Sequence, residues 1–142
     1  MDDIKLFKHR IKIKVRFSDL DAMRHVNNAT YLSYLEEARI SYFADVLQRT
    51  RNDLNFGAVV ARIEIDYLQP LIFGEEIAVL SRVSMLGNKS SEVRHLIVVY
   101  RGGAEVIAAS AVTKLVSYDY KTLKSAAIPD DVKKKIKDFE GL

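Results

Sequence analysis

Cysteine and tryptophan are absent from this chain of 142 residues, and proline occurs only twice. The lack of cysteine excludes a disulfide framework, a cysteine nucleophile, thiolate zinc sites and iron–sulfur ligation, and it fits a reducing compartment. No apolar run reaches the length of about 18 residues that a membrane span needs. The charged N-terminus, Met1 to Lys5, contains no signal-peptide core. We therefore expect a soluble, unprocessed cytoplasmic protein without a membrane partner.

A strong excess of one charge is also missing. Lys and Arg number 22 against 19 Asp and Glu, which leaves a net charge of +3 spread along the chain. The basic stretch from Lys133 to Lys137 is typical of a solvated helix face, so no nucleic-acid partner is predicted. Apolar residues make up 49% of the chain, enough to fill one core without disulfides. We expect a single domain over residues 1–142.

The hydrophobic periodicity predicts one strand, one long helix and then four further strands. Strict alternation predicts the first strand from Ile11 to Phe17. Apolar residues at three- and four-residue steps predict a helix from Ala29 to Leu47. Its apolar stripe is broad enough for the helix to be covered on much of its circumference, and a sheet curled around it would suffice. Short glycine turns between the later strands favour antiparallel pairing, and a short helix is expected after Pro129. The predicted class is α+β, with the later strands at 59–67, 77–86, 92–101 and 105–118.

Several standard sites do not occur in the sequence. There is no Gly-x-Ser-x-Gly nucleophile elbow and no Rossmann glycine pattern. The three histidines, His9, His25 and His95, lack the spacing of metal ligands, so neither a metal nor another cofactor is predicted.

The densest polar cluster runs from Asp19 to Asn28, at the start of the predicted long helix. Unpaired N–H groups at a helix start can bind an oxyanion that develops on a carbonyl, and a nearby Asp can attack the carbonyl or deprotonate water. The alternative is structural: Asp19 and Asp21 make loop turns, an asparagine caps the helix, and His25 bonds to the backbone. The residues alone leave both interpretations open.

The same residues carry a family resemblance. The segments Phe17 to Asp21, His25 to Asn28, Tyr31 to Arg39 and Asp66 to Pro70 resemble those of the hotdog-fold acyl-CoA thioesterases, in particular the 4-hydroxybenzoyl-CoA thioesterase-like branch. The resemblance implies a hotdog fold, in which an antiparallel sheet wraps around one long helix. It thus agrees with the order of elements that the periodicity predicts.

The resemblance also implies catalytic roles. Asp21 corresponds to the catalytic carboxylate, acting as nucleophile or as general base for water, and the amide of Asn28 would polarise the thioester carbonyl. His25 would either transfer a proton or orient the loop that carries Asp21. Another branch of the family places its acid on the long helix, where the candidates are Glu36 and Glu37.

The implied reaction is hydrolysis of an acyl-CoA to free acid and CoA. The acyl group would lie in an apolar channel between helix and sheet, bordered by Tyr31, Leu32, Leu35 and Phe56. The CoA phosphates would meet polar residues at strand ends, namely Arg62, Asn88, Lys89 and Ser90. The family implies a homodimer or homotetramer joined through an edge strand, with an active site built from both chains. The alternatives are an acyl-carrier-protein thioesterase, a non-catalytic acyl-CoA-binding module, and a hotdog dehydratase or hydratase.

Overall fold

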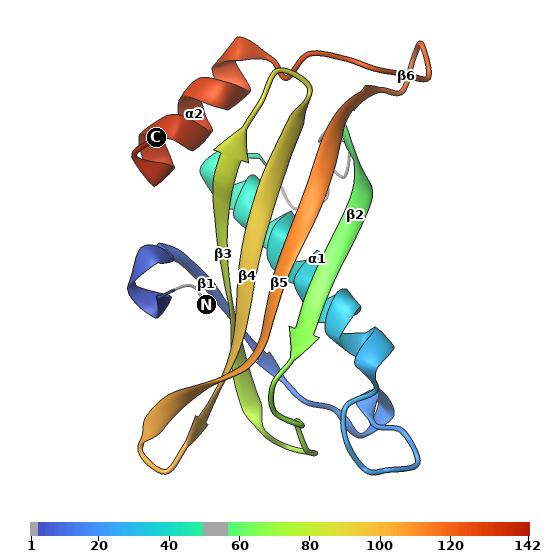
Figure 1. The fold of residues 1–142 in the computed structure, drawn as a ribbon, viewed down its shortest axis with the longest axis vertical. Coiled ribbons are helices and arrows are strands. Elements are labelled where there is room, and N and C mark those ends of the chain that lie inside the picture. Colours follow the sequence, from blue (N-terminus) through green and yellow to red (C-terminus); the bar gives the residue numbers. More distant parts are fainter. Residues whose placement is uncertain (1–2, 50–56) are drawn as a thin grey trace.

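A curled antiparallel sheet wraps around one long helix in the computed structural model, which describes residues 3–49 and 57–142 (Figure 1). The strand order is β1-β3-β4-β5-β2, and β6 pairs with the end of β5. The strands are β1 (His9–Lys14), β2 (Ala58–Tyr67), β3 (Glu76–Leu86), β4 (Ser90–Arg101), β5 (Ala104–Asp119) and β6 (Lys124–Ser125). The helices are α1 (Asn28–Val46), α2 (Asp130–Glu140) and two 3-10 turns, η1 (Ile4–Leu6) and η2 (Phe17–Asp19). No helix within the described ranges is long and apolar enough to cross a membrane.

The helix α1 is buried along most of its length. Leu35, Ala38 and Tyr42 have no exposed surface, and their spacing of three and four residues places them on one face. Full burial of a side chain such as Leu35 contributes about 1.5–3 kcal/mol to folding. The side chain of Asn27 caps the helix by accepting the N–H of Ala29 at 2.8 Å. The helix therefore supplies the central part of the core.

The sheet curls because its ladders are irregular at three places. Register shifts lie between Val60 and Arg62, between Val83 and Met85, and between Ile97 and Val98. An extra residue in one strand of a pair bends that strand and increases its local twist. The curved sheet can then cover α1 from several sides, as the broad apolar stripe of the helix requires.

The predicted order of elements is confirmed, with local differences. The long helix runs over 28–46 against a predicted 29–47, and all four later strands are present. The predicted end of the first strand is wrong: β1 stops at Lys14, and η2 follows because the Asp19 carboxylate accepts the backbone N–H of Arg16 at 3.0 Å. The short strand β6 and the turn η1 carry no periodic signal that the sequence would reveal.

The connections gather at two opposite ends of the sheet (Figure 1). The turn between β3 and β4 lies at the same end as β6 and the start of α2. The loop between β1 and α1 lies at the other end, beside the connection from β2 to β3. The polar segment at the start of α1 is therefore far from the β3–β4 turn of the same chain.

Candidate active site

The loop between η2 and α1 presents Asp21 to solvent. A bridge between Leu20 and Val26 closes the loop, and the Asp21 N–H donates to the carbonyl of His25 at 3.0 Å. One carboxylate oxygen of Asp21, Oδ1, accepts the N–H of Met23 at 2.9 Å. The other oxygen has no hydrogen-bond donor within the described part of the chain. Asp21 is thus held in place through one oxygen, and its second oxygen is left without a donor among the described residues.

Asp19, two residues earlier, has the opposite environment. Its side chain is only 3% exposed and accepts the Arg16 N–H at 3.0 Å, the Arg16 guanidinium at 3.1 Å and the Tyr34 hydroxyl at 2.7 Å. Burial alone would raise the pKa of Asp19, but these hydrogen bonds outweigh it and the pKa is lowered. The same contact and burial raise the pKa of Tyr34. Asp19 therefore anchors the loop, as the structural interpretation predicts for it, whereas Asp21 is the exposed acid of the same loop.

The first turn of α1 supplies a free amide. The N–H groups of Ala29 and Thr30 both donate to Asn27, to its side chain and its carbonyl respectively. The Asn28 N–H has no acceptor among the residues that the structure describes. The Tyr67 hydroxyl donates to the Asn28 carbonyl at 2.9 Å and so ties the end of β2 to the start of α1. A free N–H at the positive end of a helix is suited to hold a developing oxyanion.

Asp21 and Asn28 border one hollow of about 370 Å³. His25 and Tyr31 line the same hollow, so the structure brings together the three predicted catalytic residues and one predicted substrate contact. His25 is exposed, and its backbone carbonyl closes the Asp21 loop. The remaining lining residues are Met23, Val26, Tyr67, Leu68, Gln69 and Pro70.

The wall opposite α1 is the loop that follows β2, and Arg101 holds it. The Arg101 guanidinium donates to the Pro70 carbonyl at 2.7 Å and to both oxygens of Glu75 at 2.8 and 2.7 Å. The Tyr31 hydroxyl donates to the Gln69 carbonyl at 3.2 Å. Hydrogen bonds from Arg101 keep the pKa of Glu75 below its usual value. Arg101 lies at a strand end, and nothing in its local sequence marks it as part of the site.

The helix residues predicted to line an acyl channel lie in different environments. Leu35 is fully buried in a core cluster that also contains Val15 and Leu71. Leu32 is 38% exposed. Of this set only Tyr31 lines the hollow, and Phe56 lies outside the described residues.

The residues predicted to bind CoA are not near Asp21 within one chain. Asn88 and Lys89 lie in the β3–β4 turn and Ser90 begins β4, at the far end of the sheet (Figure 1). Arg62 is exposed on β2 and pairs with Glu64. None of these four residues lines the hollow beside Asp21.

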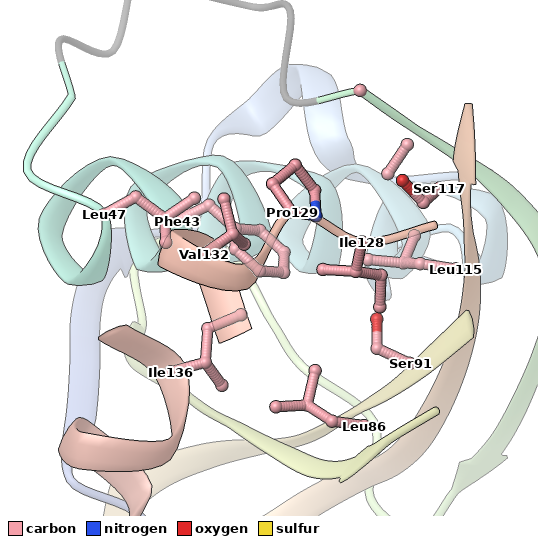
Figure 2. Close-up of a pocket in the computed structure, with 12 residues that line it drawn as sticks. Phe43, Leu47, Leu86, Ser91, Leu115, Ser117, Ile128, Pro129, Val132 and Ile136 are labelled. Atoms are coloured by element: carbon pink, nitrogen blue, oxygen red, sulfur yellow. The ribbon is translucent and has the colours of Figure 1, made fainter. Parts of the chain in front are cut away.

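A separate apolar cavity lies at that far end, between α1, α2 and the sheet (Figure 2). Phe43 and Leu47 of α1 face Val132 and Ile136 of α2 across it. Its volume of about 50 Å³ is well below the roughly 300–1,000 Å³ of typical ligand pockets, and its lining contains no titratable group. This cavity is therefore a packing gap beneath α2 and not the substrate site.

Comparison with known proteins decides the family. Residues 15–136 match the model of the thioesterase-like superfamily. The chain belongs to this superfamily. The long-chain acyl-CoA thioesterase FadM of Escherichia coli is 33% identical over 131 residues, which span 90% of this chain and 96% of FadM.

Solved structures agree with this assignment. A Thermus thermophilus thioesterase in complex with coenzyme A and Zn has 36% identity and a TM-score of 0.85, with 98% of each chain covered. A 4-hydroxybenzoyl-CoA thioesterase mutant in complex with 4-hydroxybenzoyl-CoA has 16% identity and a TM-score of 0.80 over 89% of this chain and 96% of its own, which bears on the fold alone. The expected hotdog fold is confirmed, and this member of the superfamily is a thioesterase, an enzyme that hydrolyses thioesters. Within the described residues, no group of three or more His, Asp or Glu side chains could hold a metal ion.

Proposed function

We propose that this thioesterase hydrolyses acyl-CoA to a free acid and CoA, with Asp21 as the catalytic carboxylate. The observation that carries the proposal is that the free oxygen of Asp21 and the free N–H of Asn28 border the same hollow. The relatives support the substrate class, because FadM is named for acyl-CoA and the Thermus thioesterase was solved with coenzyme A. The absence of cysteine is consistent with action in a reducing cytoplasm.

The geometry suggests how the residues divide the reaction. The thioester carbonyl oxygen would accept the Asn28 N–H at the positive end of α1, and one such donor is typically worth about 10²–10³ in rate. The free oxygen of Asp21 would then attack the carbonyl carbon, so that the C–S bond breaks and CoA leaves as a thiolate. Water hydrolyses the resulting anhydride and restores Asp21. In the general-base route, Asp21 instead takes a proton from the attacking water.

His25 would orient the Asp21 loop in this scheme. Its backbone carbonyl accepts the Asp21 N–H, whereas none of the hydrogen bonds described for the loop uses its ring. The acids Glu36 and Glu37 are exposed on α1 and do not line the hollow. Asp21 is therefore the acid that the geometry favours.

We further propose a homodimer paired through β2. This strand ends the sheet order, and its edge carries exposed apolar side chains, including Val59 and Val60. Antiparallel pairing of two β2 edges about a two-fold axis reverses the direction of the partner. The partner's β3–β4 turn then lies at the Asp21 end of the first chain. Its polar residues, Asn88, Lys89 and Ser90, could meet the CoA phosphates there.

The test measures free-thiol release from a panel of acyl-CoAs. Asp21→Asn is expected to lower kcat/KM by at least about a hundredfold because the carboxylate can no longer attack or accept a proton. Asp131→Asn, at an exposed position of α2, is the matched control and should retain full activity. Full activity of Asp21→Asn would contradict the proposal. Saturable binding by the wild type without thiol release would support a non-catalytic binding module instead.

A further inference from the structure

The hydroxyl of Tyr67 is bound to the residue that carries the free amide. It donates to the backbone carbonyl of Asn28 at 2.9 Å, so the last residue of β2 holds the first residue of α1. Asn28 thus uses its carbonyl to bind Tyr67, while its N–H has no acceptor in the described part of the chain. Both residues line the hollow that Asp21 borders. A contact on one side of Asn28 can therefore set the direction of the group on its other side.

Tyr67 is itself firmly held. Its ring meets the ring of Tyr31 edge to face, with centroids 4.9 Å apart. Tyr31 is only 3% exposed, and its hydroxyl donates to the Gln69 carbonyl at 3.2 Å. The N–H groups of Leu68 and Gln69 both donate to the Ala108 carbonyl of β5, at 2.8 and 3.0 Å. The Tyr67 hydroxyl is thus presented from a fixed strand end.

The start of α1 needs such support. The first turn of a helix has unpaired N–H groups and frays more readily than the middle. The Asn27 cap accepts the N–H groups of Ala29 and Thr30 but not that of Asn28. An oxyanion donor must lie about 2.7–3.1 Å from the oxyanion, and a displacement of about 1 Å can cost about a hundredfold in rate. The direction of the Asn28 N–H therefore bears on the rate of the proposed reaction.

A direct contact between Tyr67 and the substrate is the competing role. Tyr67 is 45% exposed and lines the hollow, so a ligand could reach its hydroxyl. Its one hydroxyl proton is already donated to the Asn28 carbonyl, which leaves only oxygen lone pairs for a ligand. A developing oxyanion needs donors, and a hydroxyl bound in this way does not supply one. The geometry thus favours a role that acts through Asn28.

We propose that Tyr67 is a positioning residue, which holds the Asn28 amide in the direction in which it binds the oxyanion. The proposal rests on the proposed function, because it takes this amide as the oxyanion donor. The oxyanion develops only in the transition state, so loss of the Tyr67 hydroxyl should impair the transition state more than the bound substrate. The loss should therefore lower kcat and leave KM almost unchanged.

The test removes the hydroxyl and keeps the ring, by Tyr67→Phe. We expect kcat for an acyl-CoA that the wild type hydrolyses to fall about tenfold or more, with KM within about twofold of the wild-type value. Tyr120→Phe is the matched control, because the Tyr120 hydroxyl also donates to a backbone carbonyl of β2, that of Ala58, at 3.2 Å and at the other end of the strand. The control should keep its kcat. Urea unfolding should show similar losses of stability in the two variants.

Three results would overturn the proposal. An unchanged kcat in Tyr67→Phe would show that the Asn28 amide keeps its direction without the hydroxyl. A higher KM with an unchanged kcat would place the hydroxyl in contact with the bound substrate. An equal fall of kcat in Tyr120→Phe would point to a general loosening of β2. Failure of the proposed function looks different, because Asp21→Asn would then keep its activity whatever the tyrosine variants do.

Discussion

Replacing Tyr34 with Phe removes one hydroxyl, and that hydroxyl donates to a buried carboxylate. The donor lies 2.7 Å from Oδ2 of Asp19, whose side chain is 3% exposed. A hydrogen bond to a charged group is typically worth about 1.5–3 kcal/mol. The Arg16 N–H still donates to the same oxygen in the variant, so the loss should lie near the lower end of that range. We expect Tyr34→Phe to reduce the free energy of unfolding by about 2 kcal/mol at pH 7.

The effect should depend on pH with a definite sign. Burial raises the pKa of Asp19, but the hydrogen bonds from Arg16 and Tyr34 lower it below the ordinary value of 3.8. A carboxyl group with a lowered folded-state pKa stabilises the protein above its unfolded pKa, and this contribution is lost as the pH falls through the folded pKa. Loss of the Tyr34 hydroxyl brings the folded pKa of Asp19 closer to the unfolded value. The deficit of the variant should therefore be constant above about pH 5 and shrink below it.

Urea unfolding between pH 7 and pH 3 measures this deficit. Tyr31→Phe is the matched control, because the Tyr31 hydroxyl donates at 3.2 Å to a neutral acceptor, the Gln69 carbonyl. Its loss should cost about 1 kcal/mol, without a pH dependence in this range. A Tyr34→Phe deficit below about 0.5 kcal/mol at pH 7, or one that does not change with pH, would refute the role of Asp19 as a charged anchor.

Two further variants test the wall of the proposed site and the proposed pairing through β2. Arg101→Lys keeps the charge but loses the forked contacts to Glu75 and Pro70. In steady-state kinetics we expect KM for acyl-CoA to rise by a larger factor than kcat falls. Unchanged kinetics would count against the loop after β2 as a wall of the binding site. Val60→Lys places a charge on the open edge of β2 and should give monomers in size-exclusion chromatography with light scattering. Lys114→Glu, which changes an exposed residue of β5, is the control. If the Val60→Lys variant is still a dimer, pairing through β2 is excluded.

Most of the fold follows from local patterns. The spacing of Leu35, Ala38 and Tyr42 predicts the long helix to within one residue at each end, since such a stripe must be buried. The predicted end of β1 is wrong because the alternation of apolar and polar residues continues to Phe17. In the structure the Asp19 carboxylate accepts the Arg16 N–H and turns the chain there. A side chain that satisfies a backbone donor in this way leaves no periodic signal.

The residues at the start of α1 are the part of the site that the sequence predicts most directly. Asp21, His25 and Asn28 fall within one segment, so the polar cluster and the family resemblance point to all three. Tyr67 and Arg101 come from the ends of β2 and β4, and only strand pairing brings them to the same end of the sheet. Their contribution could not be inferred from spacing along the chain.

Short-range periodicity and a compact motif encode the α+β class, the order of the elements and the loop segment that contains Asp19 and Asp21, so these features follow from the sequence. The different environments of the two loop acids depend on contacts between distant segments. Tyr34 of α1 and Arg16 enclose Asp19, whereas Asp21 keeps a free oxygen beside the Asn28 amide. The fold also places the β3–β4 turn at the opposite end of the sheet from the loop between β1 and α1, and it brings Phe17 beside Phe73. These outcomes depend on which distant segments the curled sheet brings into contact, and local sequence does not specify them.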